Sequence, residues 1–294
     1  MSPLSRREFL KATLAAGAIA SAGSLSLYAA SGKATDIVTL GKSGLKVTRL
    51  AFGTGSNNGY VQSSLGQKEF SRLIHYAYDS GIRFFETAES YSTPAMLGEA
   101  LKIFPRESYQ LMNKVTTNEG VDPLKRFDQM RRISQTEYFD IMLLHWQITG
   151  NWTATTSRWQ DGILEAQAKK TILARGASVH GQPALHLMPG NKWLEVAMIR
   201  MNHNGTRMDG PKYDEGNHPD QVNVVVDHVH QVKKEGMGVI SMKLVGDGAF
   251  TRHEDRQAAM RFAFKNAGID CATVGFKSTQ EIDEAIDNMN VALT

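Results

Sequence analysis

Cysteine is nearly absent from this chain of 294 residues, which contains Cys271 alone. A single thiol cannot form a disulfide within the chain. It also cannot supply the several thiolates that hold a structural zinc ion or an iron–sulfur cluster. We therefore expect no internal disulfide, no cysteine-ligated zinc and no iron–sulfur cluster. The sequence shows no carboxylate and histidine cluster at metal-ligand spacing either, so we predict that the protein binds no metal.

The body of the chain lacks an excess of either charge. The whole sequence carries 33 basic and 30 acidic residues. Residues 1–34 contain four of the basic residues and one of the acidic ones, which leaves 29 of each in residues 35–294. A surface that binds polyanions requires a basic bias, and this region has none. Nucleic acid is therefore not an expected partner.

Long apolar runs are also absent, apart from a mildly apolar stretch near the N-terminus. The sequence SRREFLK, residues 5–11, precedes ATLAAGAIASAGSLSLYAASG, which is rich in alanine, glycine and serine. Paired arginines (here Arg6 and Arg7) before a weakly apolar run are typical of a bacterial twin-arginine signal. We predict that residues 1–34 are such a signal, that the twin-arginine translocation machinery is a partner, and that the protein is exported to the periplasm.

Removal of this signal is expected after Ala22 or within residues 29–34. An uncleaved signal would instead tether the protein to the membrane. The apolar residues of the segment show no 3.6-residue period, which argues against an ordinary amphipathic helix. No other run is long enough to span a bilayer, so an uncleaved signal is the one membrane contact we expect.

Strand-like apolar runs alternate with helix-like amphipathic runs through the rest of the chain. After an opening hairpin, the strand candidates are residues 49–55, 83–89, 109–115, 139–146, 171–179, 193–203, 237–246 and 270–276. The helix candidates are residues 67–80, 93–104, 122–134, 158–170, 219–235, 252–267 and 278–292, with a short turn-rich connection at 181–190. This order predicts an α/β fold, a single (β/α)8 TIM barrel over residues 35–294. A doubly wound open sheet is the alternative, but it requires a G-x-G-x-x-G turn that GTGSNNG does not supply.

Polar side chains follow most of the predicted strands at the point where each strand ends. They are Thr54, Glu86, Tyr91, Lys114, His145, Ser178, His180, Asn202, His203, Lys243 and Lys277. The chemistry of a TIM barrel lies at the C-terminal ends of its strands. Each residue alone would be unremarkable, because strand-end lysines and histidines are often packing residues. A carboxylate, a tyrosine, a lysine and a histidine on three consecutive strands together predict an active site.

These motifs resemble those of the aldo-keto reductase family. GIRFFETAESYS, residues 81–92, is similar to that family's Gly-x-Arg/Asn-Phe-Phe-Asp-Thr-Ala-x-x-Tyr-Gly stretch. NKVTT, DIMLLHW, GASVH, GVISMKLVGDG and RFAFKNAGIDCATVGFKSTQEIDEAI follow in the family's order. The resemblance extends from about residue 37 to the C-terminus. It implies a barrel enzyme that reduces an aldehyde or ketone with NAD(P)H, and it places the family's Asp, Tyr, Lys and His tetrad at Glu86, Tyr91, Lys114 and His145.

The chemistry of carbonyl reduction by a nicotinamide hydride requires a proton donor, and the tetrad that the resemblance implies can supply one. A proton must reach the oxygen that becomes an alkoxide, and a tyrosine with a pKa of about 10 still holds its proton at neutral pH. A neighbouring ammonium, Lys114, is expected to lower the pKa of Tyr91, and a neutral His145 to polarise the carbonyl. Glu86 is one carbon–carbon bond, about 1.5 Å, longer than the family's aspartate. We expect it still to hold Lys114 charged.

The resemblance also implies a dinucleotide site with several departures from the family pattern. It places the cofactor against Gly53, Thr54, Ser178, Lys243, Leu244, Gly246, Lys277, Ser278 and Glu281. Val179 stands where the family has an asparagine, and the family's glutamine on the sixth strand is not evident in VAMIRMNH. Glu281 replaces an arginine that many NADPH-dependent members use. NADP(H) is our first expectation, with NAD(H) as the alternative.

We therefore predict an exported oxidoreductase that acts on a small carbonyl compound. The main alternative is an exported barrel that has lost catalysis and serves as a ligand-binding protein. A sugar isomerase or lyase barrel would require a metal cluster, which is not found in the sequence. The long loop 202–220 follows the sixth strand, and we expect it to cover the substrate or cofactor.

Overall fold

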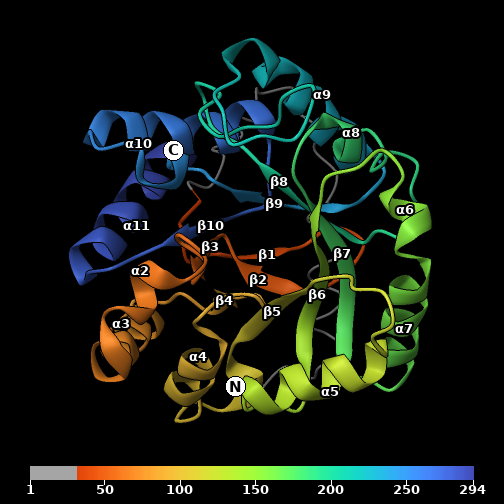
Figure 1. The fold of residues 1–294 in the computed structure, drawn as a ribbon. Coiled ribbons are helices and arrows are strands. Elements are labelled where there is room, and N and C mark those ends of the chain that lie inside the picture. Colours follow the sequence, from red (N-terminus) through yellow and green to blue (C-terminus); the bar gives the residue numbers. More distant parts are fainter. Residues whose placement is uncertain (1–31) are drawn as a thin grey trace, which may run out of the picture. The chain divides into compact units, whose positions relative to one another are not determined.

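Eight parallel strands close into the barrel that the alternating pattern predicts. In the computed structural model, which describes residues 32–294, they pair in the order β10-β3-β4-β5-β6-β7-β8-β9 (Figure 1). The strands are β3 (Leu50–Gly53), β4 (Phe84–Glu86), β5 (Gln110–Val115), β6 (Phe139–Gln147), β7 (Ile172–Val179), β8 (Val196–Arg200), β9 (Gly238–Met242) and β10 (Cys271–Gly275). Closure of the sheet excludes the doubly wound alternative. The twin-arginine motif and Ala22 lie outside the described residues.

Helices surround the barrel and connect its strands, as Figure 1 shows. The longer ones are α3 (Gly66–Asp79), α4 (Pro94–Leu101), α5 (Pro123–Ile133), α7 (Ser157–Ala168), α9 (Val222–Lys234), α10 (His253–Arg261) and α11 (Thr279–Leu293). Short helices are α2 (Tyr60–Ser63), α6 (Trp152–Thr155) and α8 (Gln182–Leu185), with 3₁₀ turns at Arg106–Ser108, Pro219–Gln221 and Gly246–Gly248. A π-helix at Phe262–Ala267 continues α10. None of the helices in residues 32–294 has the length and apolar character needed to cross a membrane.

Local sequence determines where several of these helices begin. Asp122 caps α5, because its carboxylate accepts the backbone N–H groups of Leu124 and Lys125, and Pro123 follows at the first helical position. Ser278 caps α11 by accepting the N–H of Glu281. Both caps stand on loops that follow strands of the barrel. They orient the helices that run back along its outside.

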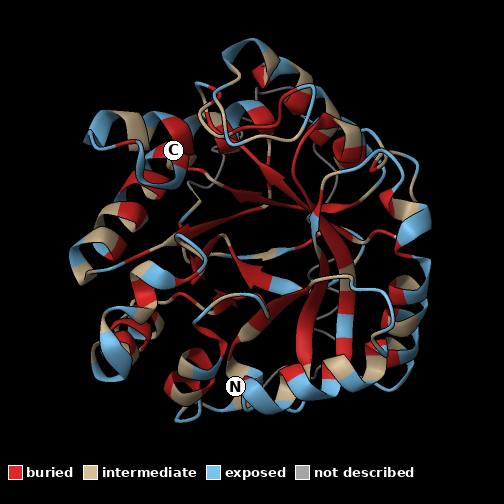
Figure 2. Ribbon diagram, in the orientation of Figure 1, coloured by how far each residue is buried: buried red, intermediate tan, exposed pale blue. Residues whose placement is uncertain are grey.

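Successive apolar side chains of a strand point to opposite faces of the sheet, which produces two apolar cores. In β6, Ile141 and Leu143 belong to the cluster inside the barrel, whereas Met142 and Leu144 pack against the helices outside it. Figure 2 shows the same division, with buried strands and with helices that are buried on their inner side and exposed on the outer one. Such alternation is the period of two that strand geometry imposes. Every second residue of a strand therefore points toward the barrel axis.

An antiparallel hairpin closes the N-terminal end of the barrel. It consists of β1 (Ile37–Thr39) and β2 (Lys46–Thr48). Leu40 and Val47 of this hairpin belong to the interior cluster, and Gly41 pairs with Met237 immediately before β9. The hairpin thus fills the end at which the parallel strands begin. The end at which they finish is left for the polar residues.

Candidate active site

Near the ends of three adjacent strands, a side chain that faces into the barrel is ionisable. Glu86 is the last residue of β4, Lys114 lies one residue before the end of β5, and His145 lies two residues before the end of β6. Each stands two positions beyond an apolar residue of the barrel interior, namely Phe84, Met112 and Leu143. A period of two along each strand therefore carries all three polar side chains into the same end of the barrel.

Glu86 and Lys114 form a buried ion pair at this end. The side chains are 4% and 1% exposed, so both charges are removed from water. Lys114 Nζ also donates to the Thr87 carbonyl oxygen at 2.8 Å, and Thr273 Oγ1 donates to Glu86 Oε2 at 3.2 Å. A Cβ atom on Gly53 would lie 3.0 Å from Glu86 Oε2. Gly53, predicted to contact the cofactor, thus lies beside the carboxylate and leaves room for it.

Tyr91 lies next to this ion pair on the loop that follows β4. Its backbone N–H donates to the Ala88 carbonyl oxygen at 3.0 Å, which bends the loop back over the barrel. Lys114 Nζ is 4.8 Å from the centroid of the Tyr91 ring, and the His145 ring lies edge-on at 5.7 Å between centroids. On its other side the ring lies against Gly55, where an added Cβ would come within 2.6 Å of the Tyr91 hydroxyl oxygen. The four predicted tetrad residues are therefore gathered in one place.

Burial dominates the ionisation of these groups. The pKa of Tyr91 is raised, mainly by burial and further by the Asp247 carboxylate, so the phenol holds its proton. This direction is opposite to the lowering that we expected from Lys114. Burial lowers the pKa of Lys114, and the Glu86 carboxylate in contact with it acts in the other direction. Burial, and then the Lys114 charge, hold the pKa of His145 well below its usual range, so the imidazole is neutral.

Residues predicted to hold a dinucleotide lie at the ends of other strands. Ser178 is fully buried near the end of β7, and its Oγ accepts the backbone N–H of Trp146 at 3.0 Å. Thr54 follows β3, and its Oγ1 accepts a hydrogen bond from Thr93 Oγ1 at 2.8 Å. After β9, Lys243 Nζ donates to Asp247 Oδ2 at 2.8 Å. The buried Leu244 and Gly246 form the turn between Lys243 and Asp247.

The predicted phosphate-binding residues surround the N-terminus of α11. Glu281 Oε2 accepts the backbone N–H of Lys277 at 2.8 Å, and Glu281 Oε1 lies 3.9 Å from Lys277 Nζ. The exposed Lys277 side chain is therefore near a carboxylate, and Ser278 caps the helix. This arrangement resembles a capping box, in which a glutamate at the third helical position returns to a backbone N–H before the helix. Glu281 thus has a structural role that the sequence pattern did not reveal.

Sequence reasoning missed a fully buried charged residue at the barrel end. Arg200 is the last residue of β8 and is fully buried. Its Nε donates to Asp209 Oδ1 at 2.8 Å, and its Nη1 donates to the carbonyl oxygens of Arg207 and Asp214. The sequence did contain a signal for Arg200. Along β8, Val196 and Met198 face the barrel interior, and the period of two continues to Arg200.

The loop 202–220 covers the ends of β6 and β7. Asp209 Oδ1 accepts the backbone N–H of Gly181 at 2.6 Å, which ties the loop to the segment after β7. The ring of Tyr213 lies 5.5 Å from Trp146 and 6.4 Å from His180 between centroids. The loop is thus in the position expected of a cover over the barrel end.

Five buried polar atoms in or near this loop have no hydrogen-bond partner among the described residues. They are Nδ1 and Nε2 of His180, Nη2 of Arg200, Nδ1 of His203 and Oδ2 of Asp209. Burial lowers the pKa of His180, and the Arg200 charge lowers it further, so this imidazole is neutral as well. Unpaired buried polar atoms cost free energy.

Residues 32–294 contain no group of three or more histidine, cysteine, aspartate or glutamate side chains arranged to hold a metal ion. Cys271 is buried, and burial raises the pKa of its thiol well above the usual range. The thiol therefore keeps its proton and packs as a small apolar side chain inside the barrel.

Comparison with known proteins identifies the class of enzyme to which this barrel belongs. The model of the Aldo/keto reductase family matches residues 49–289. The chain belongs to the aldo/keto reductase family. A probable aldo-keto reductase of Glycine max is 38% identical over 80 residues, which are 26% of this chain and 23% of that protein. Morphine 6-dehydrogenase of Pseudomonas putida is 30% identical over 115 residues, 35% of this chain and 38% of that protein. The matched part thus spans well under half of either relative.

Solved structures of the same family share the fold. A Pseudomonas aeruginosa protein assigned as an aldo-keto reductase superposes with a TM-score of 0.70 at 18% identity, covering 89% of this chain and 98% of that one. An aldo-keto reductase of Klebsiella pneumoniae in complex with NADPH superposes with a TM-score of 0.65 at 15% identity, covering 89% and 90%. At such low identity these likenesses establish the barrel and not the details of the site.

Proposed function

We propose that the protein reduces an aldehyde or ketone by hydride transfer from a nicotinamide dinucleotide, with Tyr91 as the general acid. The observation that carries this proposal is the gathering of Tyr91, His145 and the buried Glu86–Lys114 pair at one end of the barrel. Membership of the aldo/keto reductase family supports the same reaction class.

The ionisation states in the site suit proton donation to a carbonyl oxygen. Tyr91 remains protonated because burial raises the pKa of its phenol, so the proton is available when negative charge develops on the substrate oxygen. His145 is neutral and can donate a hydrogen bond to the same oxygen. Lys114, held by Glu86, places a positive charge 4.8 Å from the Tyr91 ring centroid, which stabilises the phenolate left after transfer.

The residues at the barrel end fit a dinucleotide in part. When bound, the cofactor supplies the hydride. The nitrogens of His180 and Arg200 that have no partner within residues 32–294, together with the buried Ser178 hydroxyl, would hold the polar substituent of its nicotinamide end. Lys243, Lys277 and the capped N-terminus of α11 would hold phosphate groups.

NADP(H) is the proposed cofactor. The NADPH complex of the Klebsiella pneumoniae relative supports this choice. The Glu281 carboxylate, which lies beside Lys277, opposes a 2′-phosphate at this position. NAD(H) is therefore the alternative cofactor.

Substitution of Tyr91 tests the proposed reaction. Tyr91→Phe removes the donated proton and keeps the ring, so carbonyl reduction should fall by at least about 10²-fold. Quenching or enhancement of nicotinamide fluorescence should give the same NADPH dissociation constant for both proteins. Equal rates for wild type and variant would exclude Tyr91 as the acid. If the wild-type protein binds neither NADPH nor NADH, the exported ligand-binding barrel becomes the better description.

We also propose that the protein is exported through the twin-arginine pathway. Arg6 and Arg7 before a weakly apolar run support this assignment. Replacing both by lysine keeps the charge and removes the paired arginines, so the variant should accumulate in the cytoplasm. Fractionation of a bacterial host followed by immunoblotting measures the distribution. Periplasmic recovery equal to that of the unaltered protein would contradict the proposal.

A further inference from the structure

The hydroxyl group of Ser90 lies beside the imidazole of His145, although the two residues are 55 positions apart in the chain. Ser90 Oγ is 3.4 Å from His145 Nδ1, within hydrogen-bond distance. In residues 32–294 this hydroxyl is the hydrogen-bond partner of Nδ1, and the other ring nitrogen, Nε2, has no partner there. The two nitrogens of His145 therefore have different surroundings, and Nε2 is the one left for a substrate.

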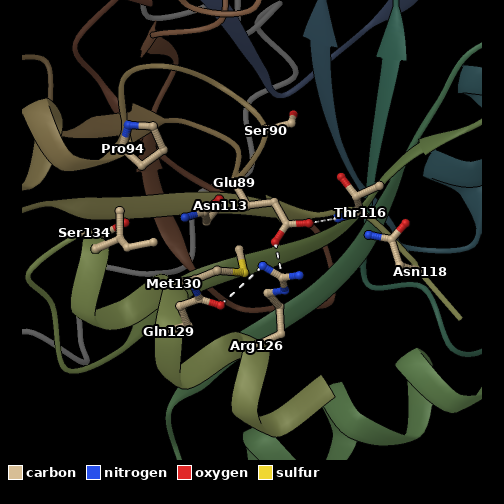
Figure 3. Close-up of a pocket in the computed structure, with 11 residues that line it drawn as sticks. Glu89, Ser90, Pro94, Asn113, Thr116, Asn118, Arg126, Gln129, Met130 and Ser134 are labelled. Atoms are coloured by element: carbon tan, nitrogen blue, oxygen red, sulfur yellow. Dashed lines mark hydrogen bonds and ion pairs between the residues drawn. The ribbon is translucent and has the colours of Figure 1, made fainter. Parts of the chain in front are cut away.

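The loop after β4 holds Ser90 in this position from both sides. Before it, the backbone N–H of Glu89 donates to the Lys114 carbonyl oxygen at 3.0 Å. Glu89 Oε1 accepts the Thr116 backbone N–H at 2.6 Å, a contact that Figure 3 marks with a dashed line. After it, Tyr91 turns the chain back through its own backbone N–H. The hydroxyl is thus presented to His145 by a segment whose backbone is fixed, which is the support that a site residue needs to keep its geometry.

A neutral imidazole carries a single proton, on one of its two nitrogens. Burial, followed by the Lys114 charge, lowers the pKa of His145 well below its usual value, so the neutral form is the one present. Which nitrogen holds the proton is set by the hydrogen bond that the other nitrogen makes. A donor facing Nδ1 leaves that atom as an acceptor and places the proton on Nε2, whereas an acceptor facing Nδ1 would draw the proton there.

The chemistry of the proposed reaction selects the first of these two arrangements. A serine hydroxyl can donate or accept, so it fits either tautomer. A nitrogen that polarises a carbonyl oxygen must be a donor, which requires the proton on Nε2. We propose that Ser90 is a positioning residue, whose hydroxyl donates to His145 Nδ1 and thereby fixes the imidazole proton on Nε2. The catalytic purpose of this contact rests on the proposed function, whereas the tautomer can be measured in the protein without substrate.

Nitrogen NMR of the protein without substrate tests the tautomer directly. The chain contains nine histidines, so the protein is isotopically labelled at the histidine ring nitrogens, and the His145 signals are identified by their absence in His145→Gln. At about pH 8, where histidines are neutral, wild-type His145 should show a protonated Nε2 and an unprotonated Nδ1. In Ser90→Ala the Nδ1 donor is lost, so both signals should move toward those of a mixture of the two tautomers.

The rate of carbonyl reduction gives a second measurement. Ser90→Ala should lower kcat by roughly 3- to 10-fold, which corresponds to the loss of one neutral hydrogen bond. The loss should stay in this range because Ser90 is exposed, so a water molecule can replace its hydroxyl in part. The NADPH dissociation constant should not change, because Ser90 is not among the residues proposed to hold the cofactor. Ser90→Thr keeps the hydroxyl and should preserve both the tautomer and kcat.

Ser92→Ala is the matched control. Ser92 is another exposed serine of the same loop, and its Oγ donates to Ser63 Oγ at 2.8 Å, so this variant should keep the wild-type tautomer and kcat. The proposal is overturned if wild-type His145 carries its proton on Nδ1, or if Ser90→Ala matches Ser92→Ala in tautomer or in kcat. If the predicted tautomer is found but the wild-type protein reduces no carbonyl compound, the hydrogen bond is confirmed, and the proposed function is rejected together with the catalytic role of Ser90.

Discussion

At the scale of single residues, the Glu86 carboxylate is the buried ion-pair partner of Lys114. Burial lowers the pKa of Lys114, and the Glu86 carboxylate opposes that effect by direct contact. Removing one partner of a buried ion pair leaves an uncompensated charge, which is far more costly than losing an exposed pair. The Glu86–Lys114 pair therefore serves both the stability of the barrel and the electrostatic environment of Tyr91.

Glu86→Gln should separate these two contributions. The free energy of unfolding should fall by about 3–5 kcal/mol, since the Lys114 ammonium loses its buried partner. Lys114 then deprotonates more readily, the pKa of Tyr91 rises further, and the high-pH limb of carbonyl reduction moves to higher pH. Glu86→Asp keeps the charge and should retain activity with the original pH profile. Urea unfolding and pH–rate profiles measure both effects.

Glu195→Gln is the matched control for Glu86→Gln. Glu195 pairs with Arg175 at 2.7 Å, and it immediately precedes β8, at the opposite end of the barrel. Its side chain is 20% exposed, so its loss should cost less free energy of unfolding. The pH–rate profile should stay unchanged. If Glu86→Gln loses stability but keeps its pH–rate profile, the Glu86–Lys114 pair has a structural role alone.

Tyr91 lies so close to Gly55 that no side chain fits at position 55 without displacing the ring. In Gly55→Ala, the added Cβ would lie within 2.6 Å of the phenol oxygen, so the ring must move. A displacement of about 1 Å in a reacting group can cost roughly 10²-fold, and we expect kcat to fall by that order. Gly150→Ala adds a methyl group with 3.6 Å of clearance and should leave kcat unchanged. Equal kcat in both variants would show that Tyr91 need not occupy its observed position.

At the scale of secondary-structure elements, the N-terminus of α11 combines a cap with a proposed phosphate site. Ser278 satisfies one of the free N–H groups of the first turn, and Glu281 satisfies the N–H of Lys277 before it. Helix N-termini attract anions through their free N–H groups and the helix dipole. The Glu281 carboxylate opposes that attraction near Lys277. The preference between NADPH and NADH should therefore depend on these two side chains.

Two variants of this helix start test cofactor preference. Glu281→Gln keeps the acceptor for the Lys277 N–H and removes one negative charge, so NADPH affinity should rise by roughly five-fold relative to NADH. Lys277→Ala should weaken NADPH more than NADH if the lysine contacts the 2′-phosphate. Gln280→Ala, a neighbouring exposed position, serves as the control. Fluorescence titrations with both cofactors give the affinities. Equal losses for both cofactors in Lys277→Ala would assign the lysine to the pyrophosphate.

At the scale of the whole molecule, two neutral histidines inside the barrel end link stability to pH. Burial lowers the pKa of both His145 and His180. Arg200, His145, Lys243 and Lys114 are the charged or titratable groups that lower the pKa of His180 further, in that order. The folded protein therefore keeps both imidazoles neutral at pH values at which an unfolded chain, with a histidine pKa of about 6.5, binds protons.

The free energy of unfolding should consequently fall as the pH falls below about 6.5. The unfolded chain binds more protons in this range, and each histidine contributes a loss of about 1.4 kcal/mol per pH unit until the folded protein protonates as well. Urea unfolding at several pH values between about 7 and 5 measures the slope. His180→Gln should remove about half of the slope contributed by this pair. An unchanged slope would show that His180 already binds its proton in the folded protein.

The sequence by itself determined the fold, because a pattern of neighbouring residues indicates each strand and each helix. Each strand of a barrel has its own apolar run, and each helix has its own amphipathic pattern, so the order of elements can be read along the chain. The topology of a closed parallel barrel then requires all strand ends to meet. Because the strand ends meet, Glu86, Lys114 and His145 could be assigned to one site from the sequence alone. The capping role of Ser278 is likewise a local property.

The tertiary structure alone decided the features that depend on distant segments. The direction of the Tyr91 pKa shift depends on burial by other strands and loops, and Lys114 by itself indicated the wrong sign. The partner of Arg200 lies nine residues away in a long loop, whose path no local pattern specifies. Burial and cavities arise from packing between elements, and packing is a property that a sequence pattern does not contain.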